Sequence, residues 1–276
     1  MNPKDAKKQY GQNFLTDPRI PRRIVALSGI GPDDNALEIG PGRGILTREL
    51  AKTAKKVVAV EIDEELIPGL KEAFAGESGV TVISGDFLKT DLASIAKEHF
   101  ESERMCVCAN IPYYITSPII LKLLAEREYV KSFTVMVQKE FAERVCAEKS
   151  TPAYSSLTLL CDYYATVKRL FTVPAGCFTP RPKVDSAVVR FDLRERPAVR
   201  VKDEKLLLGL IRAAFAYRRK TLVNCVQNAC GERFPREMIE HTLARMGCSA
   251  SARGESLDID GFAFLSDALT EYEENK

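Results

Sequence analysis

The segment Asn110–Tyr113 (Asn-Ile-Pro-Tyr) has residue types that suit the binding of a planar base with an exocyclic amino group. The amide of Asn110 offers an acceptor oxygen, and the fixed φ of Pro112 can aim a neighbouring main-chain carbonyl into the same pocket. Ile111 precedes a proline and so favours extended geometry, which is expected where a strand ends. Tyr113 adds a flat face for stacking. The segment predicts a site that holds an NH2 group against an electrophile.

A glycine-rich loop, Glu38-Ile39-Gly40-Pro41-Gly42-Arg43-Gly44, lies upstream where an expected strand meets an expected helix. Glycines at such a junction allow a tight turn and the close approach of a ligand to bare backbone. A nicotinamide-dependent oxidoreductase would require the spacing G-x-G-x-x-G/A. The sixth position is Ile45 when counted from Gly40 and Thr47 when counted from Gly42. The spacing therefore excludes that class.

Two carboxylates follow the next two expected strands. Glu61 lies twenty-one positions after Gly40, where a carboxylate can accept both hydroxyls of a ribose. Asp86 stands beside Phe87, where it can accept from an adenine amino group against an aromatic wall. Each acid alone would more often be a surface or capping residue. The glycine loop and the two acids, taken in this order, predict a site for a nucleoside cofactor. The spacing G-x-G-x-G resembles the S-adenosylmethionine loop of Rossmann-like methyltransferases.

Strand-like and helix-like stretches alternate along the first two thirds of the chain, which is typical of a parallel α/β sheet. Strands are expected at 36–39, 57–62, 80–84, 105–109, 133–138, 155–164 and 186–192, and helices at 45–54, 66–74, 91–99 and 118–127. The charged stretch 194–202, which contains Pro197, interrupts the alternation and reads as a linker. Apolar spacing then predicts helices near 206–215, 238–246 and 262–272. The expected organisation is an α/β domain over 1–193, a linker over 194–202 and a small all-helical domain over 203–276.

Composition excludes several other classes. No apolar run approaches the roughly 18 residues of a membrane span, and the N-terminus lacks an apolar core of the signal-peptide kind. The chain has eight cysteines but only His99 and His241, and it contains no C-x-x-C pair. We therefore expect no metal site and reduced, mostly buried thiols. The expectation is a cytoplasmic protein, and nothing in the sequence demands more than a monomer.

The net charge of +2 conceals two basic blocks. Residues 1–23 carry six Lys or Arg against two Asp, and residues 181–220 carry twelve Lys or Arg against five Asp or Glu. Runs of charge often do no more than solvate an exposed face, and the pattern alone does not decide between that interpretation and a binding surface. Two such blocks on a nearly neutral chain are also what a localised surface for a polyanion requires.

Taken in order, the glycine loop, Glu61, Asp86 and the Asn110–Tyr113 segment resemble the KsgA-type rRNA adenine N6-dimethyltransferases. Three further stretches extend the resemblance over nearly the whole chain. Gln9–Leu15 matches the family's N-terminal motif, Phe178–Ser186 its loop after the catalytic segment, and Ala214–Leu222 the basic helix that opens its C-terminal domain. Ile111 stands where many bacterial members carry leucine, a difference of little consequence at a position expected to act through its backbone.

The resemblance implies a Rossmann-like S-adenosylmethionine-dependent sheet and the methylation of N6 on two adjacent adenines in the 3'-terminal hairpin loop of 16S rRNA, within a pre-assembled small subunit. The cofactor residues it implies are Gln12, Asn13, Leu15, Glu38, Gly40, Gly42, Glu61, Ile62, Asp86, Phe87 and Asn110. The catalytic residues are Asn110, Ile111, Pro112, Tyr113 and Phe178, with the target base between Tyr113 and Phe178. Phosphate contacts are expected from Lys7, Lys8, Arg181, Lys183, Arg218, Arg219 and Lys220.

Two alternatives stay open. One is a 23S rRNA adenine N6-methyltransferase of the macrolide-resistance type. The other is a non-catalytic assembly or transcription factor that uses the same fold to bind nucleic acid. The intact Asn110–Tyr113 segment and the complete glycine loop favour an enzyme over the second alternative.

Overall fold

The computed structural model describes residues 11–217 and 219–276, so the predicted contacts of Lys7, Lys8 and Arg218 lie outside the described residues. The described chain forms two compact units. The first takes in the residues up to Ala142 together with Val167–Leu193, and the second consists of Glu143–Thr166 and Arg194–Lys276. The sequence had placed residues 143–166 in the first domain, whereas their contacts place them in the second unit.

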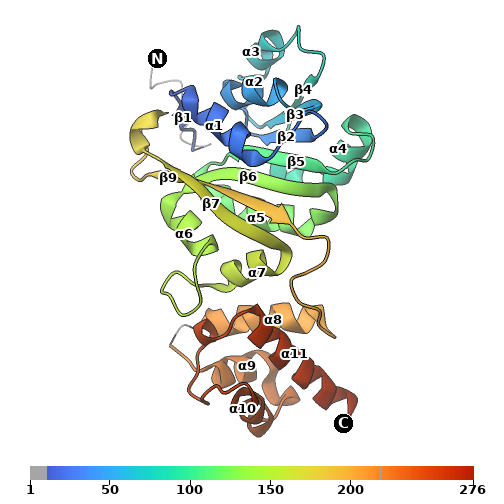
Figure 1. Cartoon of the computed structure of the whole chain (residues 1–276), viewed down its shortest axis with the longest axis vertical. Coiled ribbons are helices and arrows are strands. Elements are labelled where there is room, and N and C mark those ends of the chain that lie inside the picture. The colour runs from blue at the N-terminus through green and yellow to red at the C-terminus, as the bar shows by residue number, and fades with distance from the viewer. Residues whose placement is uncertain (1–10, 218) are drawn as a thin grey trace. The chain divides into compact units, whose positions relative to one another are not determined.

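A seven-stranded sheet forms the centre of the first unit (Figure 1). Its order is β4-β3-β2-β5-β6-β9-β7. The strands are β2 (Asn35–Ile39), β3 (Lys56–Glu61), β4 (Val80–Ser84), β5 (Met105–Asn110), β6 (Val130–Gln138), β7 (Ala165–Val173) and β9 (Ser186–Leu193). The first five in the spatial order are parallel, and β9 pairs antiparallel with β6. The predicted α/β class is confirmed, with a mixed rather than a wholly parallel sheet.

The sheet has a switch point between β2 and β5. The chain runs outward from β2 through β3 to β4, then returns to the other side of β2 with β5. Ile39 at the end of β2 pairs with Val60 on β3 and with Ala109 on β5. Loops at the carboxyl ends of such strands diverge and leave a crevice, which is where ligands bind in open α/β sheets.

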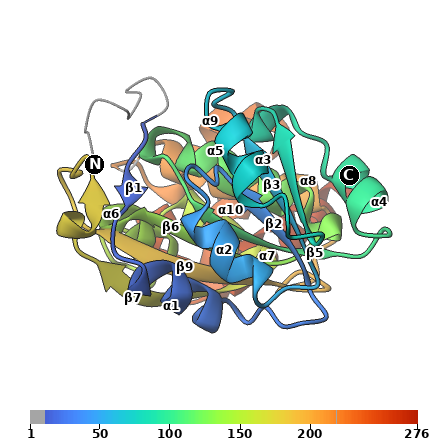
Figure 2. The same ribbon diagram turned by 90° about the horizontal axis from the view of Figure 1, so that it is seen from above.

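Helices cover both faces of this sheet. Figure 1 shows α1 and α2 on one face and α5 on the other, and Figure 2 shows α1 and α2 side by side. The helices of this part of the chain are α1 (Arg19–Ser28), α2 (Ile45–Ala51), α3 (Ile67–Ala73), α4 (Leu92–His99), α5 (Thr116–Ala125) and α6 (Lys139–Val145). Short 3-10 turns follow three of the strands, of which Phe87–Lys89 (η3) and Tyr113–Ile115 (η4) bear on the site.

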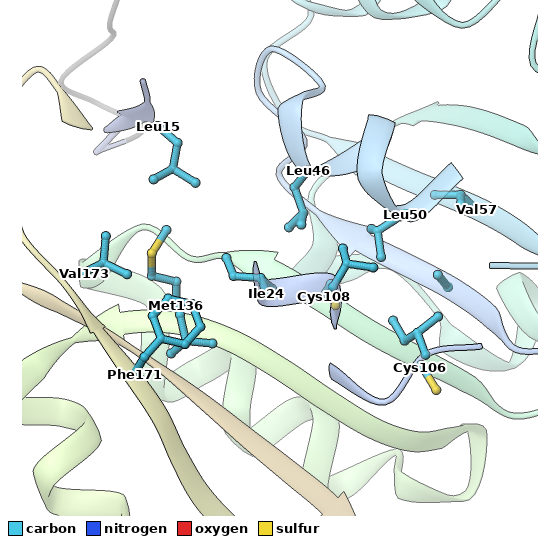
Figure 3. Packing of buried hydrophobic residues seen from close by; sticks show 14 of the residues in the cluster. Leu15, Ile24, Leu46, Leu50, Val57, Cys106, Cys108, Met136, Phe171 and Val173 are labelled. Atoms are coloured by element: carbon cyan, nitrogen blue, oxygen red, sulfur yellow. The ribbon is translucent and has the colours of Figure 1, made fainter. Parts of the chain in front are cut away.

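Apolar side chains from α1, α2 and the sheet pack together in the core (Figure 3). Ile24 and Leu50 contribute from the two helices, and Met136 and Val173 contribute from β6 and β7. Burial of this apolar surface is the main force that holds the helices on the sheet.

A second, two-stranded sheet lies beside the large one. It pairs β1 (Phe14–Leu15) antiparallel with β8 (Phe178–Thr179), with Leu15 opposite Phe178. Leu15 and Phe178 are both buried members of the core cluster. Two residues separated by most of the first unit's sequence are thereby fixed side by side.

The second unit is helical. It contains α7 (Ser156–Tyr164), α8 (Glu204–Ala216), α9 (Leu222–Cys230), α10 (Arg236–Arg245) and α11 (Ile259–Glu274). Side-chain caps begin four of these helices, since Ser155, Asp203, Thr221 and Asp258 each accept a backbone N–H from the first helical turn. The predicted helical C-terminal region is confirmed, and α9 is an additional helix.

Two sequence predictions about elements are wrong. The stretch 155–164 was expected to be a strand, but it forms α7, which Ser155 and Thr158 begin with a capping box. The strand is instead the following segment, β7. The stretch 214–222 was expected to be one basic helix, but α8 ends at Ala216 and Thr221 caps the start of α9. Arg219 and Lys220 therefore lie in a turn between two helices.

All eight cysteines are free, and four of them are buried. Within the described ranges, no helix has the length and apolar content needed to cross a membrane.

Candidate active site

A pocket opens at the switch point, where the loops after β2, β3, β4 and β5 meet. The segment Gly11–Leu15, called the strap below, also lines it. The pocket has an empty volume of about 1090 Å³, a figure that includes space open to solvent. Its lining includes all eleven predicted cofactor residues and four of the five residues of the predicted catalytic set, Asn110, Ile111, Pro112 and Tyr113.

The glycine loop after β2 adopts a backbone conformation that residues other than glycine rarely adopt. Gly42 and Gly44 have φ values of 58° and 74°, in the left-handed region. A Cβ on Gly42 would lie 3.1 Å from the Phe14 ring of the strap, and one on Gly44 would lie 2.8 Å from the Phe74 ring. The loop is thus packed from both sides, which fixes its backbone against the pocket.

Glu61 ties this loop to the end of β3. Its Oε2 accepts the N–H of Gly42 at 2.9 Å, and its Oε1 accepts the N–H of Asp63 at 2.9 Å. Burial raises the pKa of Glu61, and the two backbone N–H groups oppose the rise. Each carboxylate oxygen can accept a second donor, so the carboxylate can hold the loop and a pair of ligand hydroxyls together.

Glu38 is the most deeply buried acid of the site. It is 2% exposed, and its Oε2 has no hydrogen-bond partner within the described residues. The Thr47 hydroxyl lies near the carboxyl but makes no hydrogen bond of standard geometry to it. Burial raises the pKa of Glu38 to about 8, Thr47 opposes this rise, and the nearby Glu61 carboxylate adds to it. A cationic group bound beside this carboxyl would favour its ionised form and so offset the cost of its burial.

The third acid, Asp86, caps the short turn after β4, with Oδ1 accepting the N–H of Leu88 at 3.0 Å. Phe87 beside it is 5% exposed, and Ile62 is 43% exposed although it is a large apolar side chain. All three line the pocket. The side chains of Ile62 and Phe87 provide apolar surface for a flat ring, and Asp86 provides a carboxylate acceptor in the same lining.

The strap is fastened to the pocket by three different contacts. Gln12 Nε2 donates to Asp63 Oδ2 at 3.0 Å. The Arg43 guanidinium lies 4.7 Å from the centre of the Phe14 ring. The side chain of Asn110 donates from Nδ2 to the main-chain oxygen of Asn13 at 3.1 Å. The strap is therefore joined to the glycine loop, to the loop after β3 and to the Asn110–Tyr113 segment.

The contact with Asn13 fixes the orientation of the Asn110 amide. A carbonyl oxygen can only accept, so the NH2 of the amide must face it. Oδ1 remains as an acceptor that no described residue uses. The sequence predicted that Asn110 presents an acceptor oxygen. Because the strap binds the NH2 of the amide, the oxygen is the atom left to accept a hydrogen bond.

The backbone of the segment offers a second acceptor. Ile111 is 1% exposed and its N–H donates to Met136 O at 3.1 Å, which anchors the segment on β6. The carbonyl of Pro112 already accepts the N–H of Ile115 at 3.2 Å, whereas no donor within the described residues reaches the carbonyl of Ile111. Of the two carbonyls that the sequence left open, that of Ile111 is the available one.

The two predicted aromatic partners differ in position. Tyr113 is half-buried in the pocket wall, and its hydroxyl forms a 2.7 Å hydrogen bond with Ser186 Oγ. Burial raises the pKa of this hydroxyl, Ser186 opposes the rise and Asp185 adds to it. Phe178 is outside the pocket lining and is 4% exposed within the core cluster. The described conformation thus presents one aromatic ring of the predicted sandwich.

The predicted phosphate contacts that the structure describes are exposed. Arg181 and Lys183 lie in the loop that follows β8. In the second unit, Lys220 places its ammonium 4.9 Å from the centre of the Tyr217 ring, and Arg219 lies exposed beside it. No group of three His, Cys, Asp or Glu within the described residues is arranged to hold a metal ion.

The sequence had not singled out several residues that shape the site. Asp63 and Ser186 are buried partners of predicted residues, and nothing local in the sequence marks them. Phe14 lies inside the N-terminal motif but was not assigned a role. Tyr114, which also lines the pocket, was marked only by its place directly after the catalytic segment.

Comparison with known proteins agrees with this geometry. Residues 4–259 match the family described as ribosomal RNA adenine dimethylase. The ribosomal RNA small subunit methyltransferases A of Bacillus cytotoxicus and Bacillus mycoides are each 47% identical over 95% of this chain and 91% of theirs. Among solved structures, a dimethyladenosine transferase from Plasmodium falciparum matches with a TM-score of 0.78 at 30% identity, covering 95% of this chain and 98% of that one. The 23S rRNA methyltransferase ErmE matches with a TM-score of 0.74 at 29% identity, covering 94% and 100%.

The sheet order, the switch-point pocket and the Asn110–Tyr113 segment define a methyltransferase of the Rossmann-like class. Within that class, the chain belongs to the ribosomal RNA adenine dimethylase family. It is therefore an enzyme, and its family acts on adenine in ribosomal RNA.

Proposed function

We propose that this enzyme transfers methyl groups from S-adenosylmethionine to N6 of two adjacent adenines in the 3'-terminal hairpin loop of small-subunit rRNA. It acts as a monomer in the cytoplasm on a pre-assembled small subunit. Relatives named for the small subunit share 47% of their residues with this chain, whereas the 23S enzyme shares 29%. This difference favours the small-subunit substrate over the large-subunit alternative.

The chemistry of the pocket fits S-adenosylmethionine. Glu61 offers two carboxylate oxygens for ribose hydroxyls, and Ile62 and Phe87 offer apolar walls for the adenine, with Asp86 as acceptor. The unpartnered oxygen of Glu38 suits a cofactor that carries positive charge. When bound, S-adenosylmethionine supplies a methyl group on a cationic sulfur, which is the electrophile of the reaction.

The observation that carries the proposal is the orientation of the Asn110 amide. With Nδ2 held by Asn13 O at 3.1 Å, Oδ1 can accept one N–H of the adenine amino group. The carbonyl of Ile111 can accept the other. Two acceptors for one NH2 group draw the nitrogen out of conjugation with the ring, so its lone pair becomes available for attack.

This arrangement needs no strong base. The two acceptors act by orientation and by electrostatic stabilisation of the charge that develops on the nitrogen. The alkylated nitrogen is acidic and loses its proton readily to water. Asn110 thus positions the nucleophile without deprotonating it.

The target base must leave its stack before it reaches these acceptors. Tyr113 offers a ring fixed by Ser186 on which it can stack. For Phe178 to close the other face, its ring must leave the core cluster, where Leu15 lies opposite it on β1. Arg181 and Lys183 on the following loop, and Arg219 and Lys220 in the second unit, contribute phosphate contacts.

The test is mass spectrometry of rRNA from small and large subunits incubated with the enzyme and labelled cofactor. Dimethyladenine in the 3'-terminal hairpin of the small-subunit rRNA is the expected product. Label confined to the large-subunit rRNA would support the 23S alternative instead, and label in neither would favour a non-catalytic role.

A further inference from the structure

The most exposed of the large apolar side chains noted on the described surface is Tyr114, at 61%. It lines the same pocket as the catalytic segment and directly follows Tyr113. Single exposed apolar residues are common on protein surfaces. An exposed aromatic ring on the rim of a pocket for an RNA base needs a more specific account.

The ring is held on one side by the backbone of the strap. Gly11 has a φ of 57°, and a Cβ on it would lie 3.1 Å from Cδ1 of Tyr114 and 3.6 Å from Cβ of Pro112. The glycine therefore leaves space that the Tyr114 ring occupies. A ring seated in this way packs against the strap on one side and remains open to solvent over most of its surface.

Tyr113 and Tyr114 cannot serve the same base. Both belong to the 3-10 turn Tyr113–Ile115. Such a turn has three residues per turn, so consecutive side chains point about 120° apart. The Tyr113 hydroxyl is bound to Ser186 Oγ at 2.7 Å, which commits its ring to the pocket wall. The Tyr114 ring is thus available to a neighbouring group outside the target position.

We propose that Tyr114 is the stacking platform for the nucleotide adjacent to the target adenine. The inference rests on the proposed function, because it assumes a single-stranded RNA segment at the pocket. Recognition of unpaired RNA depends on stacking of splayed bases on aromatic rings, and such stacking tolerates any base. Tyr114 would therefore position the adenine pair without selecting its sequence. It is a substrate-positioning residue and not a member of the acceptor set.

The first test compares Tyr114→Ala with Tyr114→Phe in methyl transfer to unmodified small subunits at saturating S-adenosylmethionine. The alanine variant loses the stacking contact with one base, so its kcat/KM should fall by roughly 5- to 150-fold. The phenylalanine variant retains the ring and should stay within about 2-fold of wild type. Leu121→Ala, which shortens another exposed apolar side chain on α5 at 44% exposure, should leave activity unchanged.

A second measurement separates stacking from packing of the strap. Small subunits are reconstituted with an abasic site next to the target adenine. Wild-type enzyme should lose as much on this substrate as Tyr114→Ala loses on the normal one, and Tyr114→Ala should lose nothing further. Binding of S-adenosylhomocysteine should be equal in both proteins. The coupling between variant and abasic site is the signature of direct contact.

Equal activity of wild type and Tyr114→Ala on normal subunits would overturn the inference and leave the proposed function intact. Weaker S-adenosylhomocysteine binding in Tyr114→Ala, or full additivity of the variant with the abasic site, would also overturn it, because the ring would then serve only the strap. Absence of methylation by the wild-type enzyme itself would instead contradict the proposed function.

Discussion

The main-chain oxygen of Asn13 lies 3.1 Å from Nδ2 of Asn110, across a sequence separation of 97 residues. This one contact joins the strap, which lines the pocket, to the side chain that we propose accepts the amino group of the substrate. It decides which end of the amide is left for an incoming amino group. The strap thus both lines the pocket and orients the amide of Asn110.

Replacing Glu38 should change the pH dependence of stability in the cofactor-free enzyme. Burial raises the pKa of Glu38 from 4.5 to about 8, so the folded protein favours the neutral acid. The contribution of protonated Glu38 to the free energy of unfolding is complete below pH 4.5 and is lost as the pH rises through 8. Between these values it falls by about 1.4 kcal/mol for each pH unit. Glu38→Gln, which stays neutral, should flatten thermal stability between pH 5 and 8. An unchanged pH profile would show that Glu38 is ionised in the folded enzyme.

Glycine is required in the loop after β2 for a conformational and a steric reason. Gly44 has a φ of 74°, and a Cβ there would lie 2.8 Å from Phe74. Gly44→Ala should lower the free energy of unfolding by about 1–3 kcal/mol. Gly69→Ala in α3 is the matched control, since a Cβ there meets nothing within 4 Å, and it should be neutral or slightly stabilising. Equal stabilities of the two variants in urea titration would refute this account of the loop.

Phe178 should behave first as a core residue. It is 4% exposed in the cluster that includes Leu15, so Phe178→Ala removes a buried ring and should cost about 3–5 kcal/mol of stability. Phe178→Leu keeps most of the volume and should cost less than about 1.5 kcal/mol. If base stacking also depends on this ring, the leucine variant will fold normally but methylate slowly. A Phe178→Ala protein as stable as wild type would contradict the packing observed.

The basic turn between α8 and α9 should contribute to RNA affinity through charge alone. Replacing both Arg219 and Lys220 with alanine should weaken binding to small subunits and make its dependence on salt shallower. Each lost phosphate contact reduces the slope of log K against log salt by about 0.7–0.9. Lys56→Ala is the control, because Lys56 begins β3, at the far end from the pocket, and pairs with Glu101 at 2.8 Å. A slope unchanged in the double variant would remove the turn from the interface.

Much of the fold and site follows from the sequence because the signals are local. The glycine loop, the acids after successive strands and the Asn110–Tyr113 segment each lie where a strand of a parallel sheet ends, and parallel strands bring those ends together. All the predicted cofactor residues accordingly line one pocket. Their assignment to particular cofactor groups stays a prediction.

The misread elements have physical explanations. The stretch 155–164 is rich in apolar and aromatic residues, which suits a strand as well as a helix, and only the pairing of Ser155 with Thr158 marked a helix start. Likewise, Thr221 as an N-cap divides the basic stretch 214–222 into two elements. In both cases the helix boundaries follow the local N-cap residues and not the amino-acid composition of the stretch.

Other features depend on contacts between distant residues, which one sequence cannot give. Burial of Phe178 arises from its pairing with Leu15 between β1 and β8. The place of residues 143–166 with the second unit arises from contacts of α7 with α8 and α11, which lie far downstream in the sequence. The orientation of Asn110 arises from the carbonyl of Asn13.

The most direct test of the account is methyl transfer to unmodified small subunits by Asn110→Ala, measured by mass spectrometry together with S-adenosylhomocysteine binding by calorimetry. The variant loses the acceptor that orients the amino group, so dimethyladenine should fall at least about 100-fold, the range of one preorganised electrostatic group. Cofactor-site binding should weaken only by the lost contact to Asn13, about 1 kcal/mol or roughly 5-fold. Methyl transfer at the wild-type rate by a folded Asn110→Ala enzyme would contradict the central claim.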